Sequence, residues 1–515
     1  MLFYKRVGSP HHLLKKRWPE IAIALVALFL YIYQLGTESF WIDEILSVES
    51  AQGPLNLNRP LYFILLRGWM FFGQSDLWLR TLSMLFGLGS IILTYQLGQR
   101  IANRNAGRIS ALLLTLSPLA INHSQEVRFY MMSTFLGLAG SLYLHDLLCW
   151  RSHSAGVLRP PSTLLKTVTG WIIFRCLGFL TAQPNVLLLI PDLILIVWKA
   201  VRTSRQSGQF QLRYWLSGLV LLSVPIAIIF SDVIPELLEF LSYTTHTEST
   251  KPGIANLIGK LSALTIWPLR GPEIASFSKW LEPAYRHLFN LYSVLSLGLI
   301  ATGFVTAITK SPKLLQVFLW GLLPIFAIFI ASQAFPVLWK DRYALLSAPY
   351  LLILLAAVWT QLWHQCKPLA ILIGIIYCLS VSGPLIRYYT LDYHADWRGL
   401  AEELTLNAQP NEPVLVYPGS LVEIIDYYYE GDANFLPMDR VIAAEDLEVE
   451  EAIALIQNAE WGGDRFWLIC PVVDRWSKVK DDLIAQIEQE EFVLEQERYL
   501  LDQWAWGPAL YLFSR

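Results

Sequence analysis

The sequence predicts a polytopic α-helical membrane protein that ends in a small α/β domain. Only 16% of its 515 residues are charged, whereas soluble domains contain about 25%. Apolar runs near the roughly 20 residues that a bilayer core requires recur along the first three quarters of the chain. Beyond residue 388 the pattern changes to short, alternating helix and strand signals. We expect about 11 transmembrane helices, within a range of roughly 9 to 13.

The chain begins with a basic segment, residues 1–18, that precedes the first apolar run. Positive charges beside a span favour the cytoplasmic side, so we expect this segment to be cytoplasmic. No small-residue cleavage site follows, so the run Glu20–Leu35 is expected to stay as the first helix.

Residues 19–388 are expected to form the membrane domain. After Glu20–Leu35, the predicted spans are 77–98, 109–121, 131–150, 168–182, 185–199, 214–231, 288–308, 314–335, 343–363 and 368–388. With the N-terminus inside, every inside connection is basic, as the positive-inside rule requires. These connections contain Arg100, Arg104, Arg108, Arg151, Arg159, Lys166, Lys199, Arg202, Arg205, Arg213, Lys310, Lys313 and Lys367.

The same count places four segments outside: 36–76, 122–130, 232–287 and the tail, 389–515. An odd number of spans puts the two termini on opposite sides of the membrane. The segment 256–268 is ambiguous, because it fits either a further span or a helix lying in the interface.

The tail is strongly acidic, with 26 Asp or Glu against 8 Lys or Arg between residues 389 and 515. An acidic domain excludes a nucleic-acid partner and anionic headgroups, because both require basic faces. Its pattern predicts a helix at 396–407 with Asp396 as N-cap, and a buried strand at 413–418. Further elements are expected at 448–458, 466–470, 474–490, 492–499 and 509–513.

Two adjacent carboxylates, Asp43 and Glu44, follow the first span in the stretch FWIDEILSVES. One interpretation is structural, with Asp43 as the N-cap and Glu44 in the first turn of an interfacial helix over 45–51. The other is functional, because charges so close to a membrane are costly and tend to mark sites.

A second outer turn, NHSQEVRFY at 122–130, contains His123, Glu126 and Arg128 within six residues. A local pair between Glu126 and Arg128 would explain these charges without a function. However, two short polar turns on the same side of the membrane also predict the walls of one site.

Three stretches resemble the membrane glycosyltransferases of family 39, which include protein O-mannosyltransferases and aminoarabinose transferases of bacteria and have the GT-C fold. They are FWIDE, the segment NRPLYFILLRGWMFFGQSDLWLRTLSMLFG at 58–87, and LSPLAINHSQEVRFYMM at 116–132. Later, DRYALLSAP at 341–349 and DWRGLAEEL at 396–404 resemble the late Arg-Tyr motif and the opening of the outer domain in bacterial members.

The resemblance implies an inverting transfer of a sugar from a polyprenyl-phosphate donor to an acceptor at the outer face. It implies that Asp43 is the catalytic carboxylate, which suits a reaction whose acceptor hydroxyl must lose a proton. Glu126 is the second catalytic candidate: it could orient the acceptor, hold Arg128, or share a divalent cation with Asp43. Two carboxylates are too few ligands to predict a metal, so no cofactor is assigned and a divalent cation stays open.

A leaving phosphate requires fixed positive charge. Arg342 is our first choice, because it lies in the Arg-Tyr motif and arginine can bind phosphate with two hydrogen bonds. Its alternative role is a cation that reaches to the interface. The other candidates for donor or substrate binding are Arg128, Lys340, Arg59, Arg67, Tyr62, Tyr130, Glu44 and His123.

Two departures from the family pattern concern the acceptor. Where relatives have His-Pro-Pro-Leu-Tyr-Tyr, this chain has Asn58, Arg59, Pro60, Leu61, Tyr62 and Phe63. A common Thr-His pair is replaced by Thr181 and Ala182, and Gln183 follows. The acceptor can therefore be a glycan, a lipid or a protein.

Two other function classes stay open. A transporter or flippase for a lipid-linked saccharide would also recruit arginines, although the sequence shows no internal repeat. A non-catalytic envelope scaffold would use the acidic tail as its binding surface. For all three, we expect a multi-pass protein of the bacterial inner membrane with a periplasmic C-terminal domain.

Overall fold

A computed structural model describes most of the chain. The described residues are 10–54, 59–149, 161–207, 250–268, 281–391, 394–417, 419–437, 465–471, 481, 483–485, 487–489, 492–500 and 507–515. The predicted span 214–231 and the predicted helix 448–458 lie outside them.

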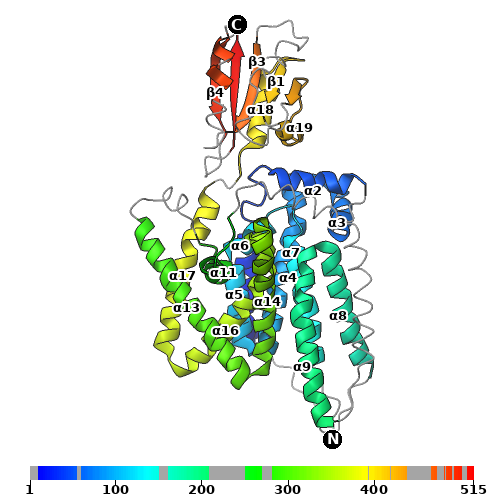
Figure 1. The fold of residues 1–515 in the computed structure, drawn as a ribbon, viewed down its shortest axis with the longest axis vertical. Coiled ribbons are helices and arrows are strands. Elements are labelled where there is room, and N and C mark those ends of the chain that lie inside the picture. Colours follow the sequence, from blue (N-terminus) through cyan, green and yellow to red (C-terminus); the bar gives the residue numbers. More distant parts are fainter. Residues whose placement is uncertain are drawn as a thin grey trace. The chain divides into compact units, whose positions relative to one another are not determined.

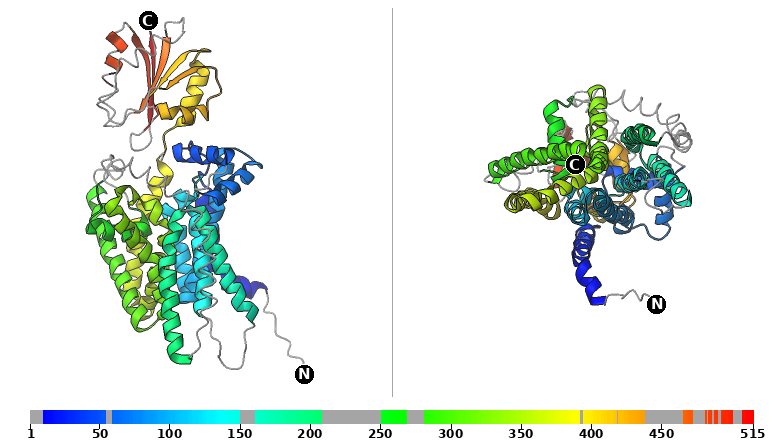
Figure 2. Two further views of the ribbon diagram at one scale, coloured as in Figure 1. Left: turned by 45° about the vertical axis from the view of Figure 1, so that its right-hand side comes forward. Right: turned by 90° about the horizontal axis from the view of Figure 1, so that it is seen from below.

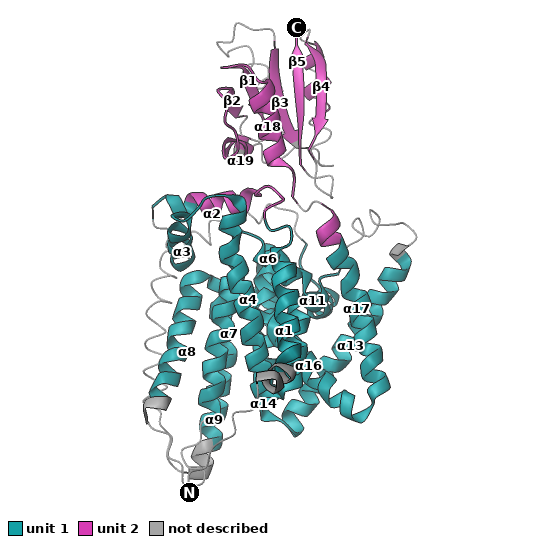
Figure 3. Cartoon of the chain, turned by 180° about the vertical axis from the view of Figure 1, so that it is seen from behind, with its two compact units in different colours: residues 1–35, 50–269, 282–386 teal, residues 36–49, 270–281, 387–515 magenta. Residues whose placement is uncertain are grey.

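The chain forms two compact units, shown in Figure 3. Unit 1 comprises residues 1–35, 50–269 and 282–386, and unit 2 comprises residues 36–49, 270–281 and 387–515. The first outer segment is therefore divided, because its beginning belongs to the same unit as the C-terminal tail.

Unit 1 is a bundle of helices, seen end-on in the right-hand view of Figure 2. Among the described residues, seven helices are long and apolar enough to cross a membrane. A central group packs α4 against α5 and α7, and α16 against α5 and α14 (Figure 1). The described helices of unit 1 are α1 (Pro10–Ile32), α3 (Pro60–Met70), α4 (Asp76–Ile101), α5 (Arg104–Thr115), α6 (Pro118–Ser124), α7 (Tyr130–Leu148), α8 (Pro161–Thr181), η1 (Gln183–Leu188), α9 (Leu189–Ser207), α11 (Ile254–Ile266), α13 (Leu281–Thr309), α14 (Pro312–Ala334), η2 (Pro336–Leu338), α15 (Asp341–Ala344), η3 (Leu345–Ser347), α16 (Ala348–Gln365) and α17 (Lys367–Thr390), which extends into unit 2.

The predicted membrane-protein class is confirmed, with two differences in the elements. The predicted span 109–121 is interrupted, because α5 ends at Thr115 and α6 begins at Pro118. Ser117 precedes this proline, which disfavours helical backbone, and its side chain caps α6 by accepting from the Ala120 amide. The ambiguous segment 256–268 forms α11, whose 13 residues are too few for a span.

Charged residues expected on the inside meet one another in unit 1. Glu20 of α1 accepts hydrogen bonds from Arg104 and Arg108 of α5. Arg100 of α4 pairs with Asp146 of α7 at 2.6 Å. At the opposite ends of α1 and α4, Arg80 donates to the Leu35 carbonyl at 3.3 Å. These contacts tie α1, α4, α5 and α7 together at their ends.

Unit 2 contains a five-stranded sheet in the order β2-β1-β3-β5-β4 (Figure 3). β1 pairs in parallel with β2 and β3, whereas β5 runs antiparallel to β3 and β4. One face packs on the side chains of Leu483 and Ile487. The elements of this unit are α2 (Ile42–Gln52, which extends into unit 1), α18 (Trp397–Asn407), β1 (Pro413–Val416), η4 (Gly419–Leu421), α19 (Val422–Asp426), β2 (Asn434–Pro437), β3 (Arg465–Pro471), β4 (Val493–Tyr499) and β5 (Pro508–Ser514).

The sequence predicted β1, β3, β4, β5 and α18 of this domain. Asp396 caps α18 as expected, since its carboxylate accepts from the Gly399 amide at 2.9 Å. β2 was missed, because its four residues include Pro437 and show no continuous burial. The alternation of helix and strand therefore gave the correct class of domain.

Residues 36–49 are held in unit 2 by specific contacts with the tail. The Phe40 amide donates to the Tyr428 hydroxyl at 2.6 Å, and the Ser39 hydroxyl contacts Asp396 at 3.3 Å. The rings of Trp41 and His394 stack at 5.8 Å. The segment that carries Asp43 is thus anchored by three residues of the tail.

Candidate functional site

The turn between α6 and α7 buries its carboxylate. Glu126 is 4% exposed, and each of its oxygens accepts a hydrogen bond from the preceding turn of chain. The Asn122 amide contacts Oε1 at 2.5 Å, and His123 Nδ1 contacts Oε2 at 2.9 Å. Both partners belong to α6, so the interruption of the predicted span at Pro118 is what builds this cluster. The Arg128 backbone amide also donates to the Glu126 carbonyl at 2.8 Å.

Two arginine side chains pack on an aromatic ring beside this turn. The guanidinium of Arg59 lies 4.2 Å from the centroid of the Phe129 ring, and that of Arg128 lies 5.3 Å from the same ring. Tyr62 is buried and its ring lies edge-on to Phe129 at 6.2 Å. Ring faces attract cations, so Phe129 holds two arginines from different elements close together.

A small pocket opens next to these rings, and it joins residues far apart in the sequence. Arg342 and Tyr343 of α15 meet Tyr130 of α7 there. Tyr130 also packs on His123, with ring centroids 4.9 Å apart. The structure therefore brings together Arg342, Tyr130, His123 and Glu126, all of which the sequence had singled out. The other lining residues are Phe129, Ser133, Thr134, Ala182, Pro184 and Leu346.

Arg342 is held in place through its neighbour in the chain. The preceding residue, Asp341, forms an ion pair with Lys260 of α11. Lys260 is 8% exposed and also lies 4.7 Å from the Trp339 ring. α11 thereby fixes the short helix α15, whose four residues could not hold a stable position alone.

Asp43 and Glu44 occupy the first turn of α2, described within unit 2. The helix begins at Ile42, one residue before Asp43, so Asp43 is not the N-cap. Glu44 is fully buried and its carboxylate accepts from the Trp41 amide at 3.3 Å. Asp43 is half-buried. The buried carboxylate thus stabilises the helix start, while its neighbour stays accessible.

A further carboxylate of α2 is perturbed. Burial, together with the negative charges of Glu423 and Asp426, raises the pKa of the Glu49 carboxyl above its ordinary value. Like charges and loss of water both disfavour the ionised form. The surface of unit 2 around α2 is therefore electrostatically unfavourable to added negative charge.

Two other predicted cations are placed differently. Lys340 is exposed and directly precedes α15. Arg67 donates to the backbone carbonyls of Ala51 and Gly53, which ties the end of α2 to α3. Its role in the structure is to connect these two helices.

The divalent cation stays a prediction. Among the described residues, no group of three or more His, Cys, Asp or Glu gathers in a way that could hold a metal ion. Two hydrogen bonds of the Glu126 carboxylate come from Asn122 and His123 of α6.

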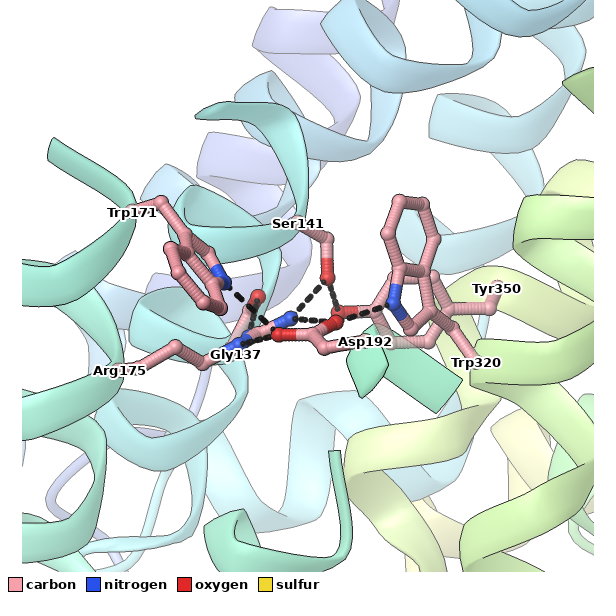
Figure 4. A network of polar contacts seen from close by, with 7 residues as sticks. All are labelled: Gly137, Ser141, Trp171, Arg175, Asp192, Trp320 and Tyr350. Atoms are coloured by element: carbon pink, nitrogen blue, oxygen red, sulfur yellow. Dashed lines mark hydrogen bonds and ion pairs between the residues drawn. The ribbon is translucent and has the colours of Figure 1, made fainter. Parts of the chain in front are cut away.

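Sequence reasoning missed a polar network buried among the spans, shown in Figure 4. Arg175 of α8 and Asp192 of α9 form an ion pair at 2.7 Å, and neither is more than 1% exposed. The Asp192 carboxylate also accepts from the indole nitrogens of Trp171 and Trp320, each at 2.8 Å. A lone Arg and a lone Asp in two otherwise apolar spans were the available signal.

The same network reaches two further helices. Arg175 donates to the Gly137 carbonyl at 2.7 Å and to the Ser141 hydroxyl at 2.8 Å, both on α7. Ser141 contacts the Tyr350 hydroxyl of α16 at 2.8 Å. One buried pair therefore joins α7, α8, α9, α14 and α16 (Figure 4).

Comparison with known sequences does not assign the chain to a family. No family model matches the chain. A protein of Aquifex aeolicus (strain VF5), described as uncharacterized, is 30% identical over 142 residues. The matched segment covers 24% of this chain and 28% of that relative, so the chain spans little more than a quarter of its length.

Comparison with solved structures is more informative. ArnT from Cupriavidus metallidurans in the apo state superposes with a TM-score of 0.57 at 13% identity, covering 97% of this chain and 98% of that one. The same protein bound to undecaprenyl phosphate gives 0.55 at 12% identity, with 96% and 98% covered. The archaeal oligosaccharyltransferase AglB from Archaeoglobus fulgidus gives 0.50 at 12% identity, with 88% and 70% covered. The chain has the GT-C fold, with a C-terminal sheet domain.

Proposed function

We propose that this chain is an inverting glycosyltransferase of the bacterial inner membrane, related to family 39. It moves a sugar from a polyprenyl-phosphate donor to an acceptor at the outer face. The observation that carries the proposal is the pocket that joins Arg342 and Tyr130, beside the cluster of Glu126, His123 and Asn122. The resemblance of the first 150 residues to family 39 and the GT-C fold support it independently.

The reaction breaks the bond between the anomeric carbon and the donor phosphate oxygen. An acceptor oxygen attacks that carbon from the opposite face, and the bonding electrons leave with the phosphate. Arg342 meets the growing negative charge, which fixed cations stabilise strongly in a site shielded from water. Arg59 and Arg128, gathered around Phe129, add positive potential on the same side of the bundle.

In this proposal Asp43 receives the acceptor proton. Its partial exposure, in contrast to the fully buried Glu44, supports that choice within the acidic pair. Glu126 is held by two hydrogen bonds and is assigned to orienting the acceptor. The N-terminus is placed in the cytoplasm and the C-terminal domain in the periplasm, following the basic inside connections.

Two proteins of the same fold support the choice of donor. ArnT from Cupriavidus metallidurans binds undecaprenyl phosphate, and AglB from Archaeoglobus fulgidus forms a complex with an inhibitory peptide and a dolichol-phosphate. We assign to this chain a polyprenyl-phosphate donor, and an acceptor that is a glycan, a lipid or a protein.

The test follows a labelled sugar from donor to acceptor. Purified wild type and Asp43→Asn are incubated with radiolabelled polyprenyl-phosphate sugars and an envelope extract. We expect transfer by the wild type and at least about a 100-fold lower rate for Asp43→Asn, the usual effect of losing a general base. Asp76→Asn, which changes another carboxylate in the first turn of a helix, serves as the matched control. Equal transfer by wild type and Asp43→Asn in folded protein would refute the role of Asp43.

One observation favours a second candidate. The sequence argument against a transporter relied on charges being confined to one face, yet Arg175 and Asp192 lie within two spans. Ionisable residues at such depth often mark transport pathways. Movement of labelled lipid across proteoliposomes without covalent transfer would support a flippase. Against it, both side chains are sealed from solvent and saturated with protein partners.

A further inference from the structure

The pocket has a polar wall that the proposed function does not yet use. Ser133 lies on α7, one turn after Phe129, and lines the pocket together with Arg342. It is 5% exposed, so what it faces is the pocket and the protein interior. The role inferred for this wall rests on the proposed function and concerns how the wall meets the donor.

Ser133 is positioned by an amide from another element. The Nδ2 atom of Asn185, in η1, donates to the Ser133 hydroxyl oxygen at 2.6 Å. The same nitrogen lies 3.5 Å from the Ala182 carbonyl. A carbonyl oxygen attracts an amide nitrogen and repels an amide oxygen, so this contact favours the orientation in which the Asn185 nitrogen faces Ser133.

The Ser133 hydroxyl oxygen therefore accepts the hydrogen bond from Asn185, and the hydroxyl hydrogen is still able to donate one. A serine hydroxyl carries one donor besides its lone pairs. Within the described residues, no acceptor for the Ser133 hydroxyl hydrogen is found. Its neighbour Thr134 differs, because its hydroxyl donates to the Tyr130 carbonyl at 3.0 Å. Of these two hydroxyls on the wall, Ser133 is the one that retains a donor for a ligand.

The Asn185 side chain is tightly packed against two glycines. A Cβ atom on Gly178 would lie 3.0 Å from Asn185 Oδ1, and one on Gly137 would lie 3.4 Å from it. The carbonyl of Gly137 is held in turn by Arg175. The buried network of Figure 4 thus holds the backbone at Gly137, one of the two glycines packed against Asn185.

This tight packing leaves one polar atom of Asn185 without a hydrogen bond among the described residues. The side chain is 1% exposed, and its Oδ1 atom has no hydrogen-bond partner among the described residues. A buried polar atom without a partner is costly and requires an explanation. Here the compensating feature is the opposite end of the amide, which orients Ser133.

We propose that the Ser133 hydroxyl donates a hydrogen bond to an oxygen of the phosphate of the lipid-linked donor, and that Asn185 is the positioning residue. The cation of Arg342 in the same pocket favours an anionic acceptor over a neutral sugar hydroxyl, because hydrogen bonds to charged groups are stronger. In this arrangement Arg342 contributes the positive charge, and the Ser133 hydroxyl contributes a hydrogen bond that orients the phosphate.

The first test measures binding to purified full-length protein. We expect Ser133→Ala to weaken binding of undecaprenyl phosphate by about 10- to 100-fold, the range for a hydrogen bond to a charged group. Inorganic phosphate should lose affinity by a similar factor, whereas polyprenol without phosphate should lose none. An equal loss for polyprenol would overturn the assignment to phosphate. The control is Ser90→Ala, since Ser90 is buried in α4 and donates within its own helix to Phe86.

The second test separates positioning from mere packing. In Asn185→Asp the new carboxylate accepts the Ser133 hydrogen and turns it away from the pocket, so affinity falls at about pH 7. As the pH falls from about 7 through the pKa of the new carboxyl, that group gains a proton and can donate again. The ratio of the variant's affinity to that of the wild type should then recover. A ratio that does not change with pH would overturn the positioning role.

The outcomes also separate this inference from the proposed function. A wild type that transfers sugar, alongside a Ser133→Ala variant with unchanged phosphate affinity, would refute the Ser133 contact alone. A wild type that neither binds the carrier nor transfers sugar would refute both.

Discussion

Two polar clusters in unit 1 differ in how their donors and acceptors are used. In the Arg175–Asp192 network each carboxylate oxygen accepts from two donors, and the partners come from five helices. In the cluster around Tyr130, by contrast, Arg342 and Ser133 line a pocket. The difference shows that charge in a membrane protein does not by itself identify a site. A network saturated by protein partners supports the fold, whereas donors directed at a pocket can serve a ligand.

The largest effect is expected from breaking the saturated network. Arg175→Met leaves the Asp192 carboxylate buried without its countercharge, which typically costs about 3 to 5 kcal/mol. Thermal unfolding in detergent should show this loss, while the specific activity of the remaining folded protein stays within about twofold. The double variant Arg175→Met with Asp192→Leu should recover part of the stability. A transfer rate that falls while stability is unchanged would instead assign the network to the site.

The opposite pattern is expected at the pocket. Arg342→Gln removes a cation that our proposal places on the donor phosphate, so donor affinity should fall by about 10- to 100-fold. Unfolding should be nearly unchanged, because Arg342 is only half-buried. Binding of polyprenyl phosphate measures the effect, with Arg286→Gln, an exposed arginine of α13, as the control. Unaltered affinity would remove Arg342 from the donor site.

A smaller effect should follow from loosening the support of Arg342. Lys260→Met breaks the ion pair with Asp341, and we expect the KM for the donor to rise about 3- to 10-fold with little change in kcat. Asp341→Asn should raise KM by a similar factor. The double variant should raise it little further, because both single changes remove the same ion pair. Strictly additive effects in this cycle would show that the two residues act separately.

The smallest effect concerns a carboxylate of α2 that has no role in the pocket. The pKa of Glu49 is raised in the folded state, so ionisation opposes folding as pH rises through the range between its ordinary and its folded pKa. Glu49→Gln should therefore stabilise unit 2 slightly at neutral pH. The gain should vanish below about pH 4.5, where the carboxyl is protonated in both states. Unfolding curves at several pH values measure it, and a gain that persists in acid would contradict this electrostatic origin.

Much of the fold could be predicted because it depends on local pattern. Apolar runs gave the membrane-protein class, the Asp396 cap gave α18, and short apolar runs gave strands of the tail such as β1, which is buried throughout. The interruption at Ser117 and Pro118 was also readable in principle, since the residue before proline disfavours helix. It was missed because hydrophobicity alone continued across it.

The site was predictable only in part. Glu126, Arg128, Tyr130 and His123 share one short motif, so their proximity follows from the chain itself. The family resemblance suggested Arg342 as a phosphate-binding residue, whereas its position beside Tyr130 and its support by Lys260 depend on how the helices pack. The pairing of Asn185 with Ser133, 52 positions apart, depends on helix packing, which single-sequence periodicity does not specify.

The anchoring of residues 36–49 by the tail has a consequence for how this protein can be divided or recombined. Deleting 387–515 would remove Tyr428, Asp396 and His394, and with them the contacts that hold Phe40, Ser39 and Trp41. A truncated protein would therefore not be the membrane half in its native form, and loss of activity on truncation would not distinguish a scaffold from a catalyst. By the same reasoning, a functional chimera would have to exchange residues 36–49 together with the C-terminal domain.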